Sequence, residues 1–310
     1  MNKKELLFLV SSILIVLLLF LVVGIFFVFS GSFALPQYFF IGSISVHYYG
    51  ITMALAVGAG WWLASKRAPK YGIDTAKIDT FLLWLAFGGF VGARAYHVAS
   101  SWRYYLEAPF DALKVWHGGL SIFGALIGGF IVIVFFGKKL LTDKQFSNRN
   151  ASYLPPSTLR LLDWLAPSVV LGQIIGRFGN FFNYEAFGYP SNLPWHMFVP
   201  EQFRPDGLLG FAFFHPLFLY EALGNACILY VLLKLGAKPS TRIARPGWLF
   251  FLYLFLYNAM RFALEFLRTD STFLWAGVRL NVLVSAGLCL TAFIGLLVLN
   301  SYDKATEQIK

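Results

Sequence analysis

The sequence predicts an all-α, polytopic membrane protein. Of its 310 residues, 58% are hydrophobic and only 13% are charged, whereas a soluble domain carries about 25% charged residues. A helix needs roughly 20 apolar residues to cross the hydrocarbon core of a bilayer. The chain offers eight runs of this kind, which we interpret as spanning helices: 6–29, 48–65, 80–99, 119–136, 161–177, 216–233, 247–266 and 280–299.

The distribution of basic residues predicts the orientation of these spans. If the amino terminus is cytoplasmic and the spans alternate, most of the 25 Lys and Arg residues fall in cytoplasmic segments, as the positive-inside rule requires. We therefore interpret the net charge of +10 as a topological signal and expect no nucleic-acid partner. The predicted location is the bacterial cytoplasmic (inner) membrane, with both termini cytoplasmic.

The first span has two interpretations. Ser32-Phe33-Ala34 resembles a signal-peptide cleavage site, and the chain begins with a basic Lys3-Lys4 pair. A signal peptide typically has an apolar core of only about 7–15 residues, so the longer run from Leu6 to Phe29 favours a retained anchor. The predicted organisation is an anchor helix at 1–34, a seven-helix membrane domain at 35–302 and a cytoplasmic tail at 303–310.

Two further features limit the class of protein. The segment 181–214 is rich in proline and aromatic residues, which predicts a small folded cap on the extracytoplasmic side, where Trp and Tyr are favoured at the membrane interface. Cys227 and Cys289 both lie inside apolar spans, where a thiol behaves as a small hydrophobic group. No Cys and His residues cluster at metal-ligand spacing, so neither a metal nor a cofactor is expected.

The segment 176–188, GRFGNFFNYEAFG, is unusually polar for a position that follows a long apolar run. It contains Arg177, Asn180, Asn183 and Glu185, and an ionised side chain in hydrocarbon costs at least about 2.5–3.5 kcal/mol. Such a cost marks a functional site. Arginine offers a planar set of donors suited to phosphate, and the two asparagines can donate beside it.

A second polar group, Arg261, Glu265 and Arg268, has helical spacing that places all three side chains on one stripe. One interpretation is an internal ion pair that ties helices together. The other is an anion site, because two arginines around one carboxylate leave a net positive charge.

Two weaker groups lie at the same ends of the predicted spans. His215-Pro216 precedes Tyr220-Glu221, and Pro216 fits the first turn of a helix. His215 is either a hydrogen-bonding partner or a base. Tyr49, in the run HYYG at 47–50, and His117, beside two glycines, complete the candidates. Together these groups suit a phospholipid head group held through its phosphate at the outer leaflet.

The segment 176–188 matches the pattern G-R-x-G-N-F-x-N-x-E-x-x-G, with every fixed position present. Further matching runs are HYYG at 47–50, WHGGLSIFGALIGG at 116–129, Asp163, HPLFLYE at 215–221 and RFALEFLR at 261–268. On these residues the chain resembles the prolipoprotein diacylglyceryl transferase family over roughly four-fifths of its length.

The resemblance implies transfer of the sn-1,2-diacylglyceryl group from phosphatidylglycerol to the lipobox cysteine of a preprolipoprotein. The products would be a thioether and glycerol 1-phosphate. Carried onto this sequence, the catalytic residues would be Arg177, Arg261, Glu265, His215 and Tyr49. The head group would be bound by Arg177, Asn180, Asn183, Glu185, Gly188 and Arg268.

Position 123 departs from the family pattern. Many members carry a histidine there, proposed as the base, and others carry tyrosine, whereas this chain has Phe123, whose phenyl ring cannot accept a proton. A milder departure is Leu217-Phe218, which replaces a more polar pair often seen after His-Pro. Either the base is His215, Glu265 or Tyr49, or the positive field of the arginines activates the thiol. An alternative function is a lipid-binding or transport protein that keeps the head-group site, and a third is a phospholipid hydrolase that uses water as the acceptor.

Overall fold

A computed structural model describes residues 27–115, 118–140, 156–237, 245–269, 274–275 and 277–307. Most of the predicted anchor helix therefore lies outside the described residues. The chain divides into two compact units, described separately below. The first comprises Met1–Val57, Leu171–Ile228 and Leu256–Leu290, and the second comprises Gly58–Val170, Leu229–Phe255 and Thr291–Lys310.

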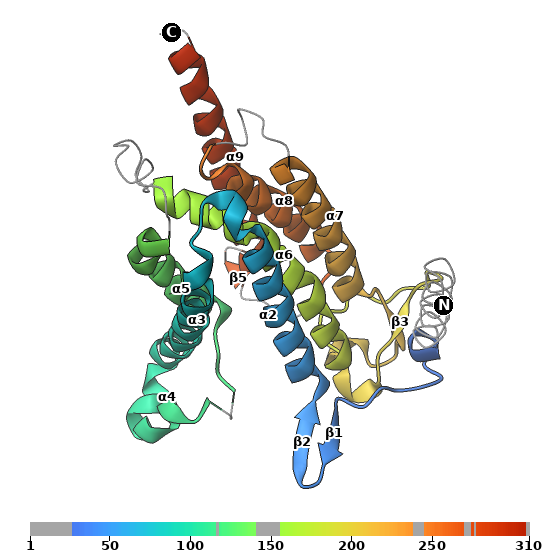
Figure 1. Cartoon of the computed structure of the whole chain (residues 1–310). Helices are drawn as coiled ribbons and strands as arrows, with labels where there is room; N and C mark the ends of the chain where they lie inside the picture. The colour runs from blue at the N-terminus through green and yellow to red at the C-terminus, as the bar shows by residue number, and fades with distance from the viewer. Residues whose placement is uncertain are drawn as a thin grey trace, which may run out of the picture. The chain divides into compact units, whose positions relative to one another are not determined.

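The structure is predominantly helical, which confirms the predicted fold class (Figure 1). The main helices are α2 (Tyr48–Arg67), α3 (Ile78–Ser100), α5 (Ile122–Phe136), α6 (Pro156–Phe182), α7 (Leu217–Ala237), α8 (Trp248–Glu265) and α9 (Leu280–Glu307). A short helix, α4 (Trp102–Glu107), follows α3. Single 3-10 turns occur at Ala68–Tyr71, Thr75–Lys77, Pro109–Leu113, Gly137–Leu140, Glu201–Phe203 and Asp206–Leu208.

Within the described residues, four helical stretches are long and apolar enough to cross a membrane: Thr75–Ser100, Thr158–Phe182, Leu217–Gly236 and Leu280–Ser301. Helix α5 is apolar but shorter. Helices α2 and α8 form where spans were predicted, but α8 carries Asn258, Arg261 and Glu265, which lower its hydropathy. The chain is thus a multi-pass membrane protein. Its helices differ more in length and hydropathy than the eight apolar runs predicted.

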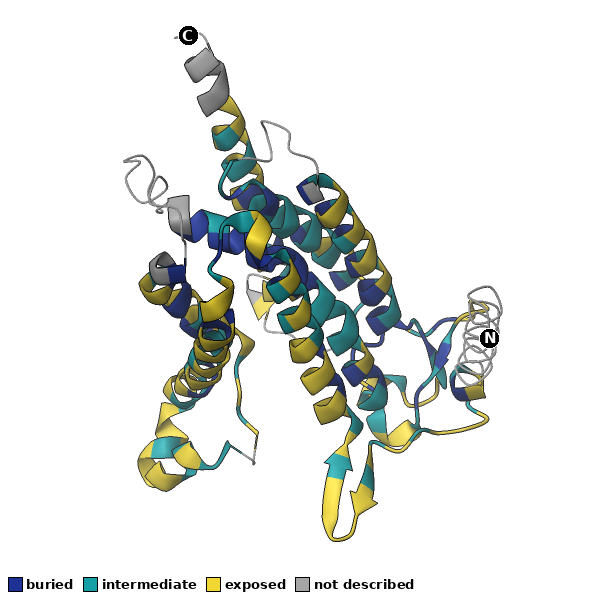
Figure 2. Ribbon diagram, in the orientation of Figure 1, coloured by how far each residue is buried: buried dark blue, intermediate teal, exposed yellow. Residues whose placement is uncertain are grey.

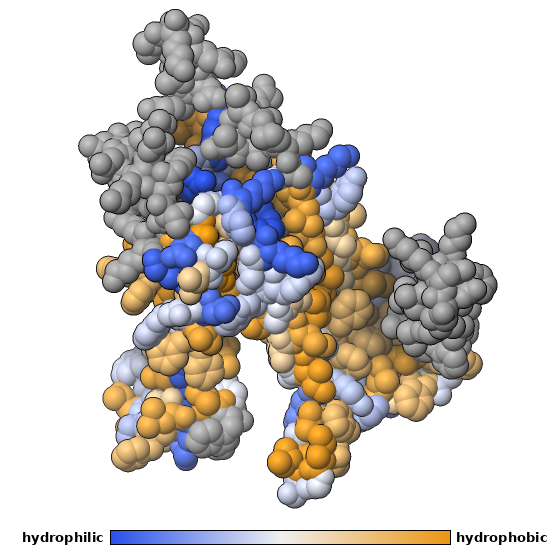
Figure 3. Space-filling view, in the orientation of Figure 1, coloured by the Kyte–Doolittle hydropathy of each residue, from blue (hydrophilic) through white to orange (hydrophobic). Residues whose placement is uncertain are grey.

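Many apolar residues of these helices are exposed (Figure 2). Examples are Phe135 and Leu126 on α5, which are 72% and 63% exposed. Figure 3 shows hydrophobic residues, coloured orange, over much of the visible surface of the helices. An exposed apolar area of this extent marks a membrane-facing surface.

The strands form three separate two-stranded antiparallel sheets. Strands β1 (Tyr38–Ile41) and β2 (Ile44–His47) form a hairpin that leads directly into α2. Strands β3 (Met197–Phe198) and β4 (Phe213–Phe214) pair within the predicted cap, and β5 (Leu274–Trp275) pairs with β6 (Val278–Arg279).

The segment 181–214 contributes most of a buried apolar cluster, to which Val28 and Phe218 also belong. Met197, Val199 and Phe214 are fully buried there, together with Phe187 and Tyr184. A stable core explains how a mostly non-helical segment keeps one conformation. The predicted small folded cap is therefore present.

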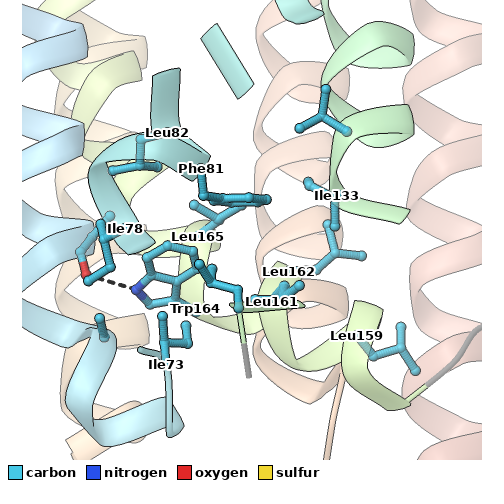
Figure 4. Packing of buried hydrophobic residues seen from close by; sticks show 14 residues of the cluster. Ile73, Ile78, Phe81, Leu82, Ile133, Leu159, Leu161, Leu162, Trp164 and Leu165 are labelled. Atoms are coloured by element: carbon cyan, nitrogen blue, oxygen red, sulfur yellow. Dashed lines mark hydrogen bonds between the residues drawn. The ribbon is translucent and has the colours of Figure 1, made fainter. Parts of the chain in front are cut away.

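The core of the second unit surrounds Trp164 on α6 (Figure 4). The Trp164 indole nitrogen donates to the carbonyl oxygen of Ala64 at 2.8 Å, and Phe81 packs against its ring. The neighbouring Asp163 carboxylate accepts from the backbone nitrogens of Gly247 (2.6 Å) and Phe250 (2.8 Å). Asp163 thereby satisfies free N–H groups at the start of α8, which have no partner within that helix.

Helices α3 and α5 pack through the glycines of Gly88-xxx-Gly92 and Gly124-xxx-Gly128. A Cβ atom at Gly92 would collide with the carbonyl oxygen of Gly124, and one at Gly128 with that of Gly88. Small residues of this kind allow helix backbones to approach closely.

Candidate functional site

The polar segment 176–188 begins on the last turns of α6 and continues into a sharply turned loop. Tyr184 and Ala186 have positive φ values of 55° and 54°, a conformation that costs a non-glycine residue about 1–2 kcal/mol. Tyr184 is held by its hydroxyl, which donates to Leu35 O at 3.0 Å, and Ala186 O accepts from Phe218 N at 3.0 Å. Burial raises the pKa of the Tyr184 hydroxyl, so it stays protonated as a donor. Backbone strain of this kind occurs preferentially at functional sites.

The turn gathers the polar side chains of the segment into one network. The Glu185 carboxylate accepts from Asn180 Nδ2 and from Asn183 Nδ2, both at 3.3 Å. Asn180 in turn accepts from Arg177 Nη1 at 3.4 Å. The network fixes Arg177 on the side of α6 that faces α7.

Glu221, on the second turn of α7, is the centre of the site. It is fully buried and forms ion pairs with Arg177 and with Arg261, whose Nη1 lies 2.5 Å from Oε1. Arg268 Nη1 lies 3.5 Å from the same oxygen. One buried carboxylate therefore serves three guanidinium groups, each of which remains partly exposed.

Glu265, on the last turn of α8, is a second buried carboxylate beside the first. Its oxygens lie 3.5 Å from Arg261, 3.9 Å from Arg268 and 4.0 Å from Arg279. Asn281 Nδ2 donates to it at 3.2 Å. Four arginines thus surround two buried carboxylates, and the exposed Glu185 is a third acid nearby. The net charge of the group is positive, and a positively charged site favours an anionic ligand.

Gly188 joins the polar segment to the end of α8. It forms an isolated antiparallel bridge with Arg268, and its backbone nitrogen donates to His215 O at 2.8 Å. A Cβ atom at this position would lie 2.6 Å from Leu267 O. The position therefore requires glycine because of the close approach of neighbouring backbone.

His215 and Tyr49, two further predicted catalytic residues, each contact different neighbours. His215 Nδ1 pairs with the Tyr220 hydroxyl at 3.1 Å, and the Trp195 indole donates to that hydroxyl at 2.7 Å. The ring of Tyr49 lies against Gly179, where an added Cβ would be 2.9 Å from Tyr49 Cδ2. Both residues thus belong to the same unit as the arginines, and their catalytic roles stay predictions.

Phe123 lies on α5 in the second unit, where its ring packs against Tyr96 with centroids 6.2 Å apart. His117 lies outside the described residues. The adjacent Gly118 and Gly119 have φ values of 85° and 75°. Their carbonyl oxygens accept from Arg94 Nη1 at 2.7 and 3.0 Å.

Arg94 is almost fully buried on α3 and organises the loop that follows α4. Besides the two glycine carbonyls, its guanidinium donates to the backbone oxygens of Asp111 (2.6 Å), Ala112 (2.9 Å) and Lys114 (3.4 Å). A guanidinium has five N–H donors. Arg94 therefore serves as an internal template for the loop.

Sequence reasoning missed part of this arrangement. Glu221 was recognised in the run 215–221 but was not selected as a site residue, and Arg279 and Asn281 were not considered. The signal for Glu221 was available, because a carboxylate inside an apolar span must find a partner. Arg279 and Asn281 gave no comparable signal, since both lie at the end of a span, where polar residues are ordinary.

The arrangement has the chemistry of an anion site. Guanidinium groups bind phosphate and carboxylate through paired donors. Within the described residues no three His, Cys, Asp or Glu side chains are grouped so as to hold a metal ion. These features define a helical multi-pass membrane protein with a cluster of arginines around two buried carboxylates, built from α6, α7, α8 and the loops beside them.

Comparison with known proteins assigns the family. Residues 36–298 match the family model described as prolipoprotein diacylglyceryl transferase. The phosphatidylglycerol–prolipoprotein diacylglyceryl transferase of Thermotoga maritima is 38% identical over 278 residues, covering 88% of each chain. The enzyme of the same name from Prochlorococcus marinus (strain MIT 9301) is 38% identical over 279 residues, covering 83% of this chain and 89% of the relative. This chain belongs to the prolipoprotein diacylglyceryl transferase family.

Proposed function

We propose that this protein transfers the diacylglyceryl group of phosphatidylglycerol to the lipobox cysteine of a preprolipoprotein. The observation that carries the proposal is the group of Arg177, Arg261 and Arg268 around the buried Glu221. This group contains the arginine of the family motif and provides a positive site for the lipid phosphate. In the reaction the cysteine sulfur forms a bond to the sn-3 carbon of the diacylglyceryl group. The C–O bond to phosphate breaks, and its electron pair leaves with glycerol 1-phosphate.

The charge of the site suits the leaving group. The lipid phosphate is a diester with one negative charge, whereas a phosphate monoester carries about −1.5 to −2 at neutral pH. Four arginines and two buried carboxylates give a surplus of positive charge beside the phosphate. Charge that increases during the reaction is stabilised more strongly in the transition state than in the substrate, which accelerates the reaction.

The acceptor thiol must also lose its proton, because the thiolate is the nucleophile and a free cysteine has a pKa of about 8.5. Glu265 is engaged by arginines and by Asn281, so protonating it would weaken these contacts. We assign thiol activation to the positive field of the arginines, which lowers the thiol pKa. His215 is the alternative acceptor: in the tautomer whose Nδ1–H donates to the Tyr220 hydroxyl, Nε2 is the ring nitrogen that can accept a proton.

The proposal includes the setting of the reaction. The enzyme would act in the bacterial cytoplasmic membrane with both termini cytoplasmic and the arginine site towards the outer leaflet. Phosphatidylglycerol and exported preprolipoproteins would be its partners. The catalytic domain would comprise residues 35–302, after an anchor at 1–34 and before a tail at 303–310. The basic segments between spans support this orientation.

Reconstitution with phosphatidylglycerol and a lipobox peptide tests the function. We expect release of glycerol phosphate only when the peptide contains cysteine, with a matching gain of diacylglyceryl mass on the peptide. A peptide with serine in place of that cysteine is the matched control. Release without any peptide would indicate a hydrolase. Lipid binding without release under either condition would indicate a binding or transport protein and would overturn the proposal.

A further inference from the structure

Asn225 lies on α7 one helical turn beyond Glu221 and is fully buried. Neither its Oδ1 nor its Nδ2 has a hydrogen-bond partner among the residues that the structure describes. A buried amide without partners costs about 1–3 kcal/mol. Leucine, which has a similar size, would avoid that cost at this position, so the amide is retained at the expense of stability.

The spacing places Asn225 within reach of Glu221. Residues four apart on a helix lie on the same face, with about 5–6 Å between their Cβ atoms. Rotation of the two side chains is therefore enough to bring Asn225 Nδ2 to a Glu221 oxygen. Both residues are fully buried, so water does not compete for that contact.

The Glu221 carboxylate needs an additional hydrogen-bond donor during the reaction. In the structure its carboxylate is neutralised by Arg177, Arg261 and Arg268. These same guanidinium groups are the ones that bind phosphate in the proposed function. When they turn towards a phosphate, Glu221 loses part of its compensation, and a buried carboxylate that loses its partner is strongly destabilised.

We propose that Asn225 is a positioning residue that donates a hydrogen bond to Glu221 when the arginines engage the phosphate of the lipid. The inference rests on the proposed function, because it requires a substrate phosphate at the arginines. In this arrangement the unpartnered amide of the resting state becomes partnered in the lipid-bound state. The hydrogen bond releases the arginines from Glu221 and so strengthens phosphate binding without contacting the lipid.

The test compares Asn225→Leu with the wild-type protein in detergent micelles titrated with phosphatidylglycerol. Binding is measured from the rise of Tm with lipid concentration. We expect Asn225→Leu to have a higher Tm without lipid and an affinity for phosphatidylglycerol about tenfold weaker. This factor corresponds to about one hydrogen bond to a charged group. Asn225→Gln, which keeps an amide donor, is expected to recover part of the affinity.

Ser168→Ala is the matched control. Ser168 is buried on α6, and its hydroxyl has no hydrogen-bond partner in the described part of the chain. Its removal is expected to leave lipid affinity unchanged. Wild-type affinity in Asn225→Leu, or a lower Tm without lipid, would overturn the role of Asn225. A wild-type protein that phosphatidylglycerol does not stabilise would overturn the proposed function itself, which separates the two failures.

Discussion

Gly188 and Arg268 pair across an isolated antiparallel bridge, 80 residues apart in the sequence. The bridge joins Gly188, in the loop after α6, to Arg268, which lies three residues beyond the end of α8. It therefore fixes Arg268 beside Glu221 and Glu265, with which it shares ion pairs. The glycine at the end of the motif acts through backbone geometry and has no side chain that could bind the lipid.

Gly188→Ala is expected to reduce transfer activity at least tenfold and to lower the free energy of unfolding by about 1–3 kcal/mol. The added Cβ would meet Leu267 O at 2.6 Å and His215 Cβ at 3.0 Å, so backbone must move. Activity and thermal unfolding measure the two effects. Gly207→Ala is the control, because a Cβ there meets nothing within 4 Å. Equal activity and equal thermal stability in the two variants would show that the bridge does not position Arg268 for the reaction.

Arg177→Ala and Arg261→Ala are each expected to abolish turnover while the protein still inserts into the membrane. Each substitution removes a guanidinium from the phosphate site and leaves Glu221 less well compensated. The measurement is glycerol phosphate release by protein recovered in the membrane fraction. Arg103→Ala is a control, because Arg103 is exposed and contacts the ring of Trp102. Near-wild-type activity in both site variants would remove the argument for a phosphate site.

Arg94→Lys is expected to lower the free energy of unfolding by about 1–3 kcal/mol. Lysine has three donors in place of five, so some of the partly buried backbone oxygens of Asp111, Ala112, Lys114, Gly118 and Gly119 lose their partner. Thermal unfolding measures the loss. Limited proteolysis should show earlier cleavage within 108–120. Wild-type stability would indicate that the loop keeps its conformation without this template.

Phe123→His is expected to leave the rate and its pH profile unchanged. Phe123 is half-exposed and packs against Tyr96, and thiol activation is assigned to the arginines. The measurement is transfer rate against pH over the range in which histidine titrates. A higher rate with a new inflection near the histidine pKa of about 6.5 would show that a base at this position contributes to catalysis.

Much of the architecture could be predicted from the sequence. Helices α2, α3, α5, α6, α7, α8 and α9 form where the apolar runs predicted them, but α6 extends beyond its run at both ends and α9 continues to Glu307, into the predicted tail. Within the described residues four helical stretches are long and apolar enough to span a membrane, and α8 is less apolar because it carries polar residues of the site.

Several residues of the candidate site were predicted from the sequence, but the central Glu221, Arg279, Asn281 and the contacts between the helices were not. The sequence by itself determined that Arg177, Arg261, Glu265 and Arg268 must find partners, because uncompensated charge is costly in a membrane. It also determined the family, through the spacing of the motif. Local spacing allowed Glu265 to pair with either arginine of its own helix, and it gave no reason to join Glu265 to Arg279.

Only the tertiary structure decided which charges meet. It placed Glu221 of α7 between Arg177 of α6 and Arg261 of α8, and it left Asn225 buried without a partner among the described residues. The physical reason is that helical periodicity fixes which residues share one face of a helix, whereas packing fixes which faces meet. Contacts between helices depend on that packing and therefore cannot be obtained from spacing within one helix.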